Sequence, residues 1–277
     1  MSITRRAFLK RTFAAGAFFG VGSVAYAGGY ERHGVQVVRQ PLRLGLSTPL
    51  RAALLTDIHF DPLYETGWLR HVFALVADAR PDLILYAGDY VTKTTARFEE
   101  FGRIVGSYRA PLGACASLGN HDHWTDRWSR RGEGSEKIRS VFAANGIQLL
   151  RNAVVPLPHN PGWALAGFES FWAGHPNRKL LTHAPADTQF ISLVHEPDAW
   201  DVLVDPRIRL QVSGHTHGGQ VRAPFYGALR LPTWGRKYDA GLFSRGGRHL
   251  YVSRGIGTVN IPCRVNCSPE ITILELT

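Results

Sequence analysis

Two hydrophobic periods alternate along the first half of the chain. A continuous apolar run over residues 52–56 is typical of a strand buried on both faces. Between residues 68 and 80, apolar positions recur at i, i+3, i+4 and i+7, which predicts an amphipathic helix ended by Pro81. The alternation continues with a strand over 83–86, a helix over 98–108 and a strand over 114–118. This order of strands and helices predicts a βαβ-built sheet.

The second half of the chain is richer in extended segments. Helices are expected there only at residues 135–144 and 198–204, and a short β-like segment at 35–46 precedes the first apolar run. The further strands are expected at residues 147–157, 163–167, 190–194, 208–212, 250–253 and 271–276. No linker, repeat or low-complexity tract follows Gly34, so we expect one α/β domain over residues 28–277.

Polar clusters stand where the predicted strands end. They are Asp57-Ile58-His59, Gly88-Asp89, Gly119-Asn120-His121-Asp122, His195, and Gly214-His215-Thr216-His217. Ligands of open α/β sheets bind outside the carboxyl ends of the strands, so groups far apart in sequence can converge there. Seven side chains offer oxygen or imidazole ligands: Asp57, His59, Asp89, Asn120, His195, His215 and His217. A donor set without cysteine favours Mn, Fe or Zn over thiolate chemistry.

The ordered set of clusters resembles the calcineurin-like metallophosphoesterase superfamily over most of the chain. The string from Gly214 to Gln220, with Ser253-Arg254-Gly255-Ile256-Gly257-Thr258 and Pro269-Glu270-Ile271, is similar to a bacterial subgroup of membrane-proximal phosphodiesterases. One branch of that subgroup acts on UDP-diacylglucosamine. The resemblance implies an α/β fold: a four-layer αββα sandwich with two mixed sheets and the metal site at strand carboxyl ends.

The resemblance also implies two metal ions. Asp57, His59 and His217 would hold the first ion, Asn120, His195 and His215 the second, and Asp89 would bridge them. Two cations about 3.5 to 4 Å apart can share a water, lower its pKa and direct the resulting hydroxide at phosphorus. We assign His121 to stabilising the transition state or protonating the leaving alkoxide, with Asp122 orienting its ring. The alternative for Asp122 is a carboxylate that caps a helix.

The first thirty residues are typical of a targeting segment. Arg5 and Arg6 precede a short apolar patch, and an uncharged stretch runs from residue 12 to 30. This arrangement resembles a twin-arginine export signal, which the twin-arginine translocation machinery would read. A peptidase could cut at Ala25-Tyr26-Ala27, leaving residues 1–27 as a signal peptide, and an uncleaved anchor is the alternative. We therefore expect a periplasmic location or one at the outer face of the cytoplasmic membrane.

The net charge and the remaining motifs limit the choice of binding partners only in part. The net charge of +10 favours anionic partners such as phospholipid headgroups, but it is no signature of nucleic-acid binding. Trp124 lies in a stretch of tryptophans and arginines that could form a lid over the site, and Arg254 could approach a phosphate. Among the three cysteines, Cys263 and Cys267 are the closer pair.

These observations lead to one principal function and two alternatives. The principal hypothesis is a metal-dependent hydrolase of a phosphodiester or phosphomonoester, acting near the membrane on a phospholipid or another envelope component. A nucleotide phosphodiesterase or nuclease is the first alternative. A noncatalytic metal-bearing binding protein is the second, and the intact His121-Asp122 pair argues against it because binding alone needs no proton donor.

Overall fold

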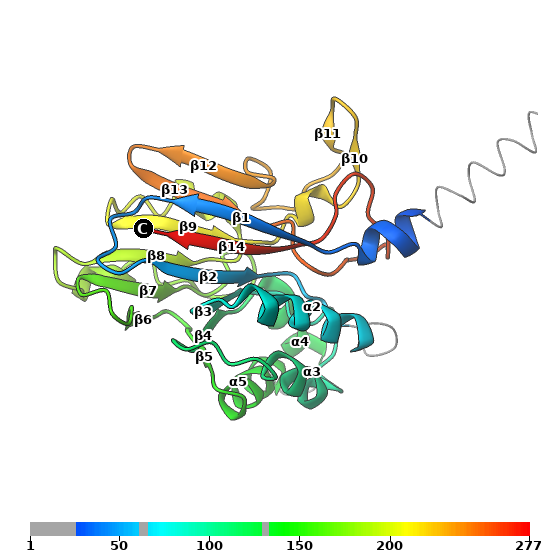
Figure 1. Ribbon diagram of the computed structural model, residues 1–277, viewed down its shortest axis with the longest axis horizontal. Helices are drawn as coiled ribbons and strands as arrows, with labels where there is room; N and C mark the ends of the chain where they lie inside the picture. Colours follow the sequence, from blue (N-terminus) through cyan, green and yellow to red (C-terminus); the bar gives the residue numbers. More distant parts are fainter. Residues whose placement is uncertain (1–25, 61–65, 129–132) are drawn as a thin grey trace, which may run out of the picture.

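Two six-stranded mixed sheets lie face to face at the centre of the computed structural model, which describes residues 26–60, 66–128 and 133–277 (Figure 1). In spatial order, the first sheet contains β1 (Gln36–Leu42), β14 (Glu270–Leu276), β2 (Leu50–Leu55), β3 (Leu83–Ala87), β4 (Ala114–Ser117) and β5 (Ile147–Leu149). Strands β2 to β5 pair in parallel, whereas β14 runs antiparallel to β2. The parallel part is the βαβ unit that the alternating periods predicted.

The second sheet has a parallel centre and antiparallel edges. Its order is β12 (Gly241–Arg245), β13 (Arg248–Val252), β9 (Ile208–Ser213), β8 (Gln189–Leu193), β7 (Trp163–Gly167) and β6 (Ala153–Pro156). Strands β13, β9, β8 and β7 are parallel, and β12 and β6 close the two edges. A separate hairpin of β10 (Arg222–Ala223) and β11 (Gly227–Ala228) projects beyond the sheets (Figure 1).

Helices cover the outer faces of both sheets. The α-helices are α2 (Thr66–Ala79), α3 (Phe98–Val105), α4 (Asn120–Trp128) and α5 (Glu133–Ala144), and the shorter helices are η1 (Tyr26–Glu31), η2 (Leu180–His183), η3 (Pro197–Asp201) and η4 (His217–Gly219). Buried side chains of α2, α3 and α5 pack on the first sheet. On the second sheet, η2 and η3 supply part of the covering layer. The four-layer order of the predicted sandwich is therefore present, with 3₁₀ helices in the fourth layer.

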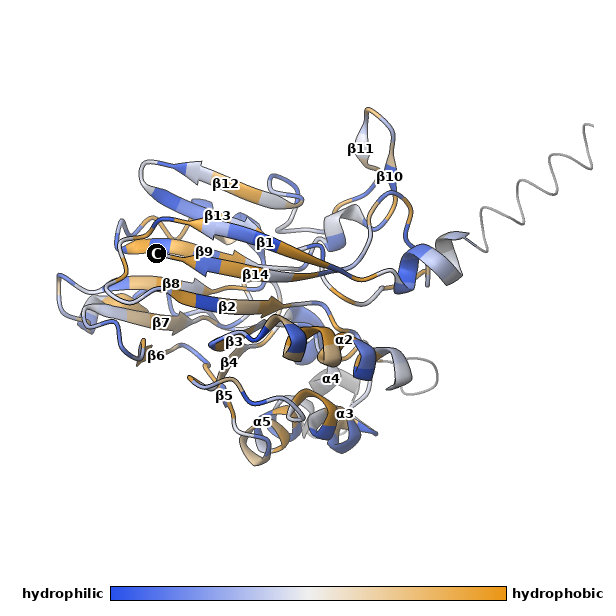
Figure 2. Ribbon diagram, viewed as in Figure 1, coloured by the Kyte–Doolittle hydropathy of each residue, from blue (hydrophilic) through white to orange (hydrophobic). Residues whose placement is uncertain are grey.

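The layer between the sheets is apolar, as two sheets packed face to face require. Leu54 and Leu85 of the first sheet and Leu193 and Val212 of the second are fully buried in one cluster. Figure 2 shows how hydrophobic residues follow the central strands and the inner sides of the helices. Because both faces of the central strands are covered, their sequences are continuously apolar instead of alternating.

Three local expectations differ from the structure. The strand predicted over 147–157 is two strands, because the chain turns at residues 150–152 and passes from β5 in the first sheet to β6 in the second. The helix predicted over 198–204 is the five-residue 3₁₀ helix η3. Neither α4 nor the edge strand β12 was predicted, since α4 has a polar sequence and β12 is mostly exposed.

The predicted export signal lies almost entirely outside the described residues, which begin at Tyr26. Within the described ranges, no helix is long and apolar enough to cross a bilayer. The cysteines Cys115 and Cys267 are buried, Cys263 is half-buried, and all three are free thiols.

We expect Phe142→Ala to lower the free energy of unfolding by about 3 to 5 kcal/mol, because it would open a cavity among packed rings. Phe142 is fully buried, and its ring centroid lies 4.7 Å from that of Tyr90 and 5.7 Å from that of Phe98. Urea denaturation followed by circular dichroism would measure the change. Val204→Ala is the control, because Val204 is 69% exposed; equal losses in the two variants would contradict the assignment of Phe142 to the core.

Candidate metal centre

Loops from both sheets bring the seven predicted ligands together at one end of the molecule. Asp57 and His59 follow β2, Asp89 follows β3, Asn120 begins α4 after β4, His195 follows β8, and His215 and His217 follow β9. None of the seven residues is more than 5% exposed. The carboxyl ends of parallel strands therefore converge as expected.

Donor atoms form two groups that meet at Asp89. Ligand atoms of Asp57, His59 and His217 lie within 4.8 Å of one another, and so do those of Asp89, His195 and His215. The Oδ2 atom of Asp89 is 3.1 Å from Nε2 of His195 and 3.6 Å from Nε2 of His59. One carboxylate oxygen thus faces both groups. Asp89 also forms a third group with His59 and His121.

The hydrogen bonds that the buried donor atoms lack indicate that the site suits a cation. Among the described residues, the buried Oδ1 of Asn120 has no hydrogen-bond partner, a state that costs about 1–3 kcal/mol. The Nε2 atoms of His217 and His59 face each other at 3.2 Å. Two neutral imidazoles in this arrangement can direct lone pairs at a shared neighbour, as metal ligands do. The residues present therefore fit bound metal ions.

Surrounding backbone groups fix the orientation of the ligands. The ring N–H at Nδ1 of His195 donates to the carbonyl of Ala87 at 2.7 Å, and Nε2–H of His215 donates to the carbonyl of Thr233 at 2.8 Å. Each ring then keeps its other nitrogen for a metal. The backbone N–H of His215 also donates to both carboxylate oxygens of Asp57, at 2.9 and 3.0 Å.

Five of the seven ligands have a backbone conformation that non-glycine residues rarely adopt. Asp57, His59, Asp89, His215 and His217 have φ values between 46° and 73°. Each such residue costs free energy and persists only where the surrounding structure enforces it, which is typical of functional sites.

Glycines next to the ligands allow the loops to approach one another. A side chain at Gly119 would collide with the carboxylate of Asp89, and one at Gly214 would collide with that of Asp57. Gly119 therefore allows close packing between two loops of the first sheet, and Gly214 allows it between loops of the two different sheets.

Comparison with known proteins agrees with this geometry. The sequence pattern of the calcineurin-like phosphoesterase family matches residues 50–219. The chain belongs to this family. It is 33% identical to the phosphodiesterase YaeI of Escherichia coli and 32% identical to the metallophosphoesterase YkuE of Bacillus subtilis. The alignments cover 99% of this chain with 99% of YaeI and 98% of YkuE.

A third relative is more distant. UDP-2,3-diacylglucosamine pyrophosphatase LpxG of Chlamydia trachomatis is 27% identical over 75% of this chain and 78% of its own length. The family and its phosphodiesterase and pyrophosphatase members make this chain a metal-dependent phosphoesterase, a hydrolase of phosphoric esters.

Asp122 is placed differently from our expectation. Its Oδ2 accepts the backbone N–H groups of Asp89 and Gly119, each at 2.8 Å, and its Oδ1 accepts that of Tyr90 at 2.9 Å. The ring of His121 is held instead by the carbonyl of Thr92, which accepts the Nδ1–H at 2.9 Å. The Asp122 carboxylate therefore binds backbone N–H groups and not the His121 ring. Gly119 directly precedes α4, as the capping alternative supposed, whereas Asp89 and Tyr90 belong to the loop after β3.

The two predicted substrate contacts have different surroundings. Trp124 lines a pocket of about 600 Å³ over the metal centre, where its ring lies 4.8 Å from that of Trp172 and 4.9 Å from that of His121. Arg254 donates from Nε to Glu270 at 2.6 Å, and it is not among the described residues that line this pocket. Trp172, which was not among the predicted substrate contacts, joins the wall from a distant loop.

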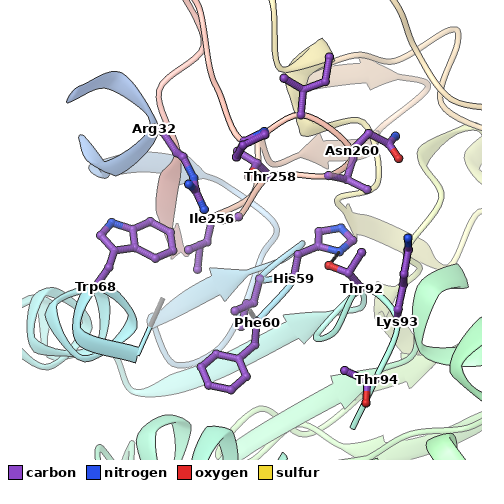
Figure 3. Close-up of a pocket in the computed structure, with 15 residues that line it drawn as sticks. Arg32, His59, Phe60, Trp68, Thr92, Lys93, Thr94, Ile256, Thr258 and Asn260 are labelled. Atoms are coloured by element: carbon purple, nitrogen blue, oxygen red, sulfur yellow. Dashed lines mark hydrogen bonds between the residues drawn. The ribbon is translucent and has the colours of Figure 1, made fainter. Parts of the chain in front are cut away.

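A second pocket, of about 680 Å³, lies beside His59. Figure 3 shows Arg32 and Trp68 on one side of it and Lys93 on the other, with His59 between them. Two pockets therefore adjoin the candidate metal centre of this chain.

Charges in the centre are strongly coupled. Burial by itself would raise the pKa of Asp89, but His195, His121 and His59 together hold it well below its usual range. Burial would likewise lower the pKa of His195, and the attraction of Asp89 raises it well above its usual range. Burial lowers the pKa of His59 and His215 to about 3 and raises that of Asp57 to about 6. His195 and Asp89, 3.1 Å apart, therefore each favour the charged form of the other.

We expect metal binding to release a proton and to strengthen as pH rises. A ligand imidazole must be neutral, and His195 holds its proton below a raised pKa, so protons compete with the cation as pH falls. Calorimetric titration with Mn²⁺ or Zn²⁺ in two buffers of different ionisation enthalpy would count the protons released. His249→Gln, on β13, is the control and should leave the count unchanged; an affinity independent of pH would contradict the expectation.

Arg264 is a residue that sequence reasoning missed. It is fully buried, and its guanidinium donates to the carbonyls of Gly257, Cys267 and Arg254 at 2.6, 3.0 and 2.8 Å. Gly257 in turn donates to the carbonyl of Asp57 at 2.7 Å. Arg264 thus fixes the loop that packs behind the first metal ligand.

We expect Arg264→Met to destabilise the fold by about 3 kcal/mol or more, because it leaves several buried carbonyls without donors. Urea unfolding and metal content would be measured on the same preparation. Arg209→Met is the control, because within the described residues Arg209 donates to an exposed carbonyl, that of Gly247, and to no buried one. A variant as stable as the wild type would show that the carbonyls do not depend on Arg264.

Proposed function

We propose that this chain is an exported phosphodiesterase that uses two metal ions and acts on a phosphorylated lipid or another envelope component. The observation that carries the proposal is Oδ2 of Asp89, which faces His195 at 3.1 Å and His59 at 3.6 Å. A carboxylate oxygen in this position can serve one cation in each donor group. The names of YaeI, a phosphodiesterase, and LpxG, a diacylglucosamine pyrophosphatase, support the reaction and the lipid-related substrate.

Each donor group has a defined role in the proposed reaction. Asp57, His59 and His217 would hold one ion, Asn120, His195 and His215 the other, and Asp89 both. When bound, the two cations would supply Lewis-acid stabilisation of the phosphoryl oxygens and a water of lowered pKa. The backbone N–H of His121 holds Oδ1 of Asp89 at 2.8 Å, which leaves Oδ2 for the cations.

His121 is the residue best placed to act on the leaving group. The Thr92 carbonyl holds its Nδ1–H, so Nε2 is the ring atom available to substrate. His121 lines the pocket with Trp124 and Trp172. From there the imidazolium form of the ring, which carries a proton on Nε2 as well as on Nδ1, can donate the Nε2 proton to the leaving oxygen as its bond to phosphorus breaks, or stabilise charge on that oxygen. The rings of Trp124 and Trp172 form the wall of the pocket on this side of the centre.

Export is part of the proposal and is supported by the sequence alone. The paired Arg5 and Arg6, the uncharged stretch after residue 12 and the Ala25-Tyr26-Ala27 cleavage sequence favour a twin-arginine signal or an anchor. Either would place the metal centre in the periplasm or at the outer face of the cytoplasmic membrane.

We expect His121→Ala to lower kcat for bis-p-nitrophenyl phosphate by roughly 10²- to 10⁴-fold while metal content stays at the wild-type level. Asp89→Ala should lose metal and activity together, because Asp89 faces both donor groups. Hydrolysis would be assayed after loading with Mn, Fe or Zn, and bound metal would be counted by mass spectrometry.

The same assay separates the alternatives. Faster turnover of p-nitrophenyl phosphate than of the diester would favour a phosphomonoesterase, and turnover of oligonucleotides would favour a nuclease. Full metal occupancy without turnover of any phosphoester would favour the noncatalytic binding protein. Loss of metal in His121→Ala would make His121 a ligand, consistent with its proximity to His59 and Asp89.

A further inference from the structure

Large apolar side chains are exposed in three segments beside the metal centre. They are Tyr26, Tyr30, Phe225, Tyr226, Leu229 and Ile261, which are 50% to 112% exposed. These six are over half of the eleven exposed large hydrophobic side chains in the described ranges. A concentration of this kind is unusual, because exposed apolar residues are normally scattered singly.

The three segments adjoin one another, and together we call them the docking face: η1, the β10–β11 hairpin with Leu229, and the loop 259–262. The hairpin is tied to the chain just after that loop, since the N–H of Arg222 donates to the carbonyl of Val265 at 2.9 Å. Gln220 donates from Nε2 to the carbonyls of Val259 and Ile261 at 3.2 and 2.8 Å. A Cβ at Gly28 of η1 would lie 3.6 Å from the carbonyl oxygen of Pro262.

Phe225, at the tip of the hairpin, has a backbone conformation and an exposure that are both unusual for a bulky apolar residue. Its φ is +64°, a conformation rarely adopted by a bulky side chain, and its ring is fully exposed. Neither backbone preference nor burial within the chain accounts for this placement. Figure 2 shows the hydrophobic tip projecting away from the sheets. Strain that gains no internal contact is a reason to look for a function outside the fold.

The docking face opens onto both cavities of the metal centre. Leu229 and Ile261 line the pocket over the ligands, together with the exposed Arg230 and Arg236. Ile261 also lines the second pocket, beside His59. A molecule bound to the docking face therefore lies at the entrance to the metal centre, next to the positive charges of Arg230 and Arg236.

We propose that the docking face lies on an anionic lipid bilayer, with Phe225 and Tyr226 at the depth of the headgroups. Aromatic side chains favour the interface between water and hydrocarbon, and arginines beside them favour anionic headgroups. The net charge of +10 has the complementary sign. The described chain also begins on this face at Tyr26, directly after an uncharged apolar sequence from residue 12 to 25.

The shape of the face favours a bilayer over a second protein. Its aromatic side chains sit at the tip of a narrow projecting hairpin and on the separate helix η1, instead of forming one flat patch. A tip of this kind can enter a fluid headgroup layer without a matching cavity. Docking does not require catalysis, so this inference stands apart from the proposed phosphodiesterase activity.

Quenching by brominated lipids tests the contact directly. The full chain would carry Phe225→Trp, or Val204→Trp as the matched control, because Val204 is also exposed, at 69%, but precedes β9, at the opposite end of the strands. Vesicles of phosphatidylglycerol and phosphatidylcholine would be prepared with and without bromine on the acyl chains. Emission of the added tryptophan is obtained by subtracting the wild-type spectrum.

We expect the Trp of F225W to lose emission in brominated vesicles and the Trp of V204W to keep it. A chain that does not bind the vesicles would overturn the proposal. So would a bound chain whose F225W emission is unaffected, since the leader alone would then hold the protein, or one in which both variants are quenched equally. A change in F225W emission that follows protein concentration and not lipid would assign the face to a second copy of the chain.

Turnover of bis-p-nitrophenyl phosphate by the same preparations keeps the two proposals separate. Phe225 lies outside the metal pocket, so F225W should hydrolyse this soluble diester at the wild-type rate. Quenching without turnover would support docking and contradict the phosphodiesterase, whereas turnover without quenching would do the reverse.

Discussion

The carboxylate of Asp89 is the constraint on which the centre of the molecule depends. It is a buried anion, and a buried charge is tolerated only when it is paired and hydrogen-bonded. Its Oδ1 accepts the His121 N–H, while Oδ2 faces His59 from the first sheet and His195 from the second. Side chains from both sheets therefore face the charge of the Asp89 carboxylate. Asp122 supports the position of Asp89 by accepting the backbone N–H groups of Asp89 and Gly119.

Loops at this junction are strained, and the layers beneath them offset the strain. Five ligands have positive φ values, each at a cost on the order of 1–3 kcal/mol. The apolar layer between the sheets and the ring cluster around Phe142 contribute the compensating burial. Arg264 adds buried hydrogen bonds on the side of Asp57. Rigid support of this kind keeps the ligand atoms in place, which a metal site requires.

The sequence predicted what local periods and strand ends determine. Continuous apolar runs identified β2, β3 and β4, and the polar residues after them gave Asp57, Asp89 and Asn120, because parallel strands end at one edge. The turn at residues 150–152 was missed, since both β5 and β6 are apolar and only pairing assigns them to different sheets. The contacts of Asp122 and Arg264 were missed for a related reason: they involve backbone groups, which carry no sequence signal.

Position relative to a membrane would decide which phosphoesters reach the centre. A bilayer of anionic lipid concentrates phosphate groups in a thin layer, and a basic protein is steered toward that layer before any specific contact forms. The hairpin that follows the His215 and His217 loop is tied through Gln220 to the loop that lines both cavities. The hairpin also contacts the segment that follows His217, since Nη1 of Arg222 donates to the carbonyl of Gly218 at 2.7 Å. Displacement of the hairpin by a surface would therefore act on the entrances to the metal centre and on the segment next to His217. Recognition of a membrane and chemistry at phosphorus would thus be coupled through neighbouring loops of one fold.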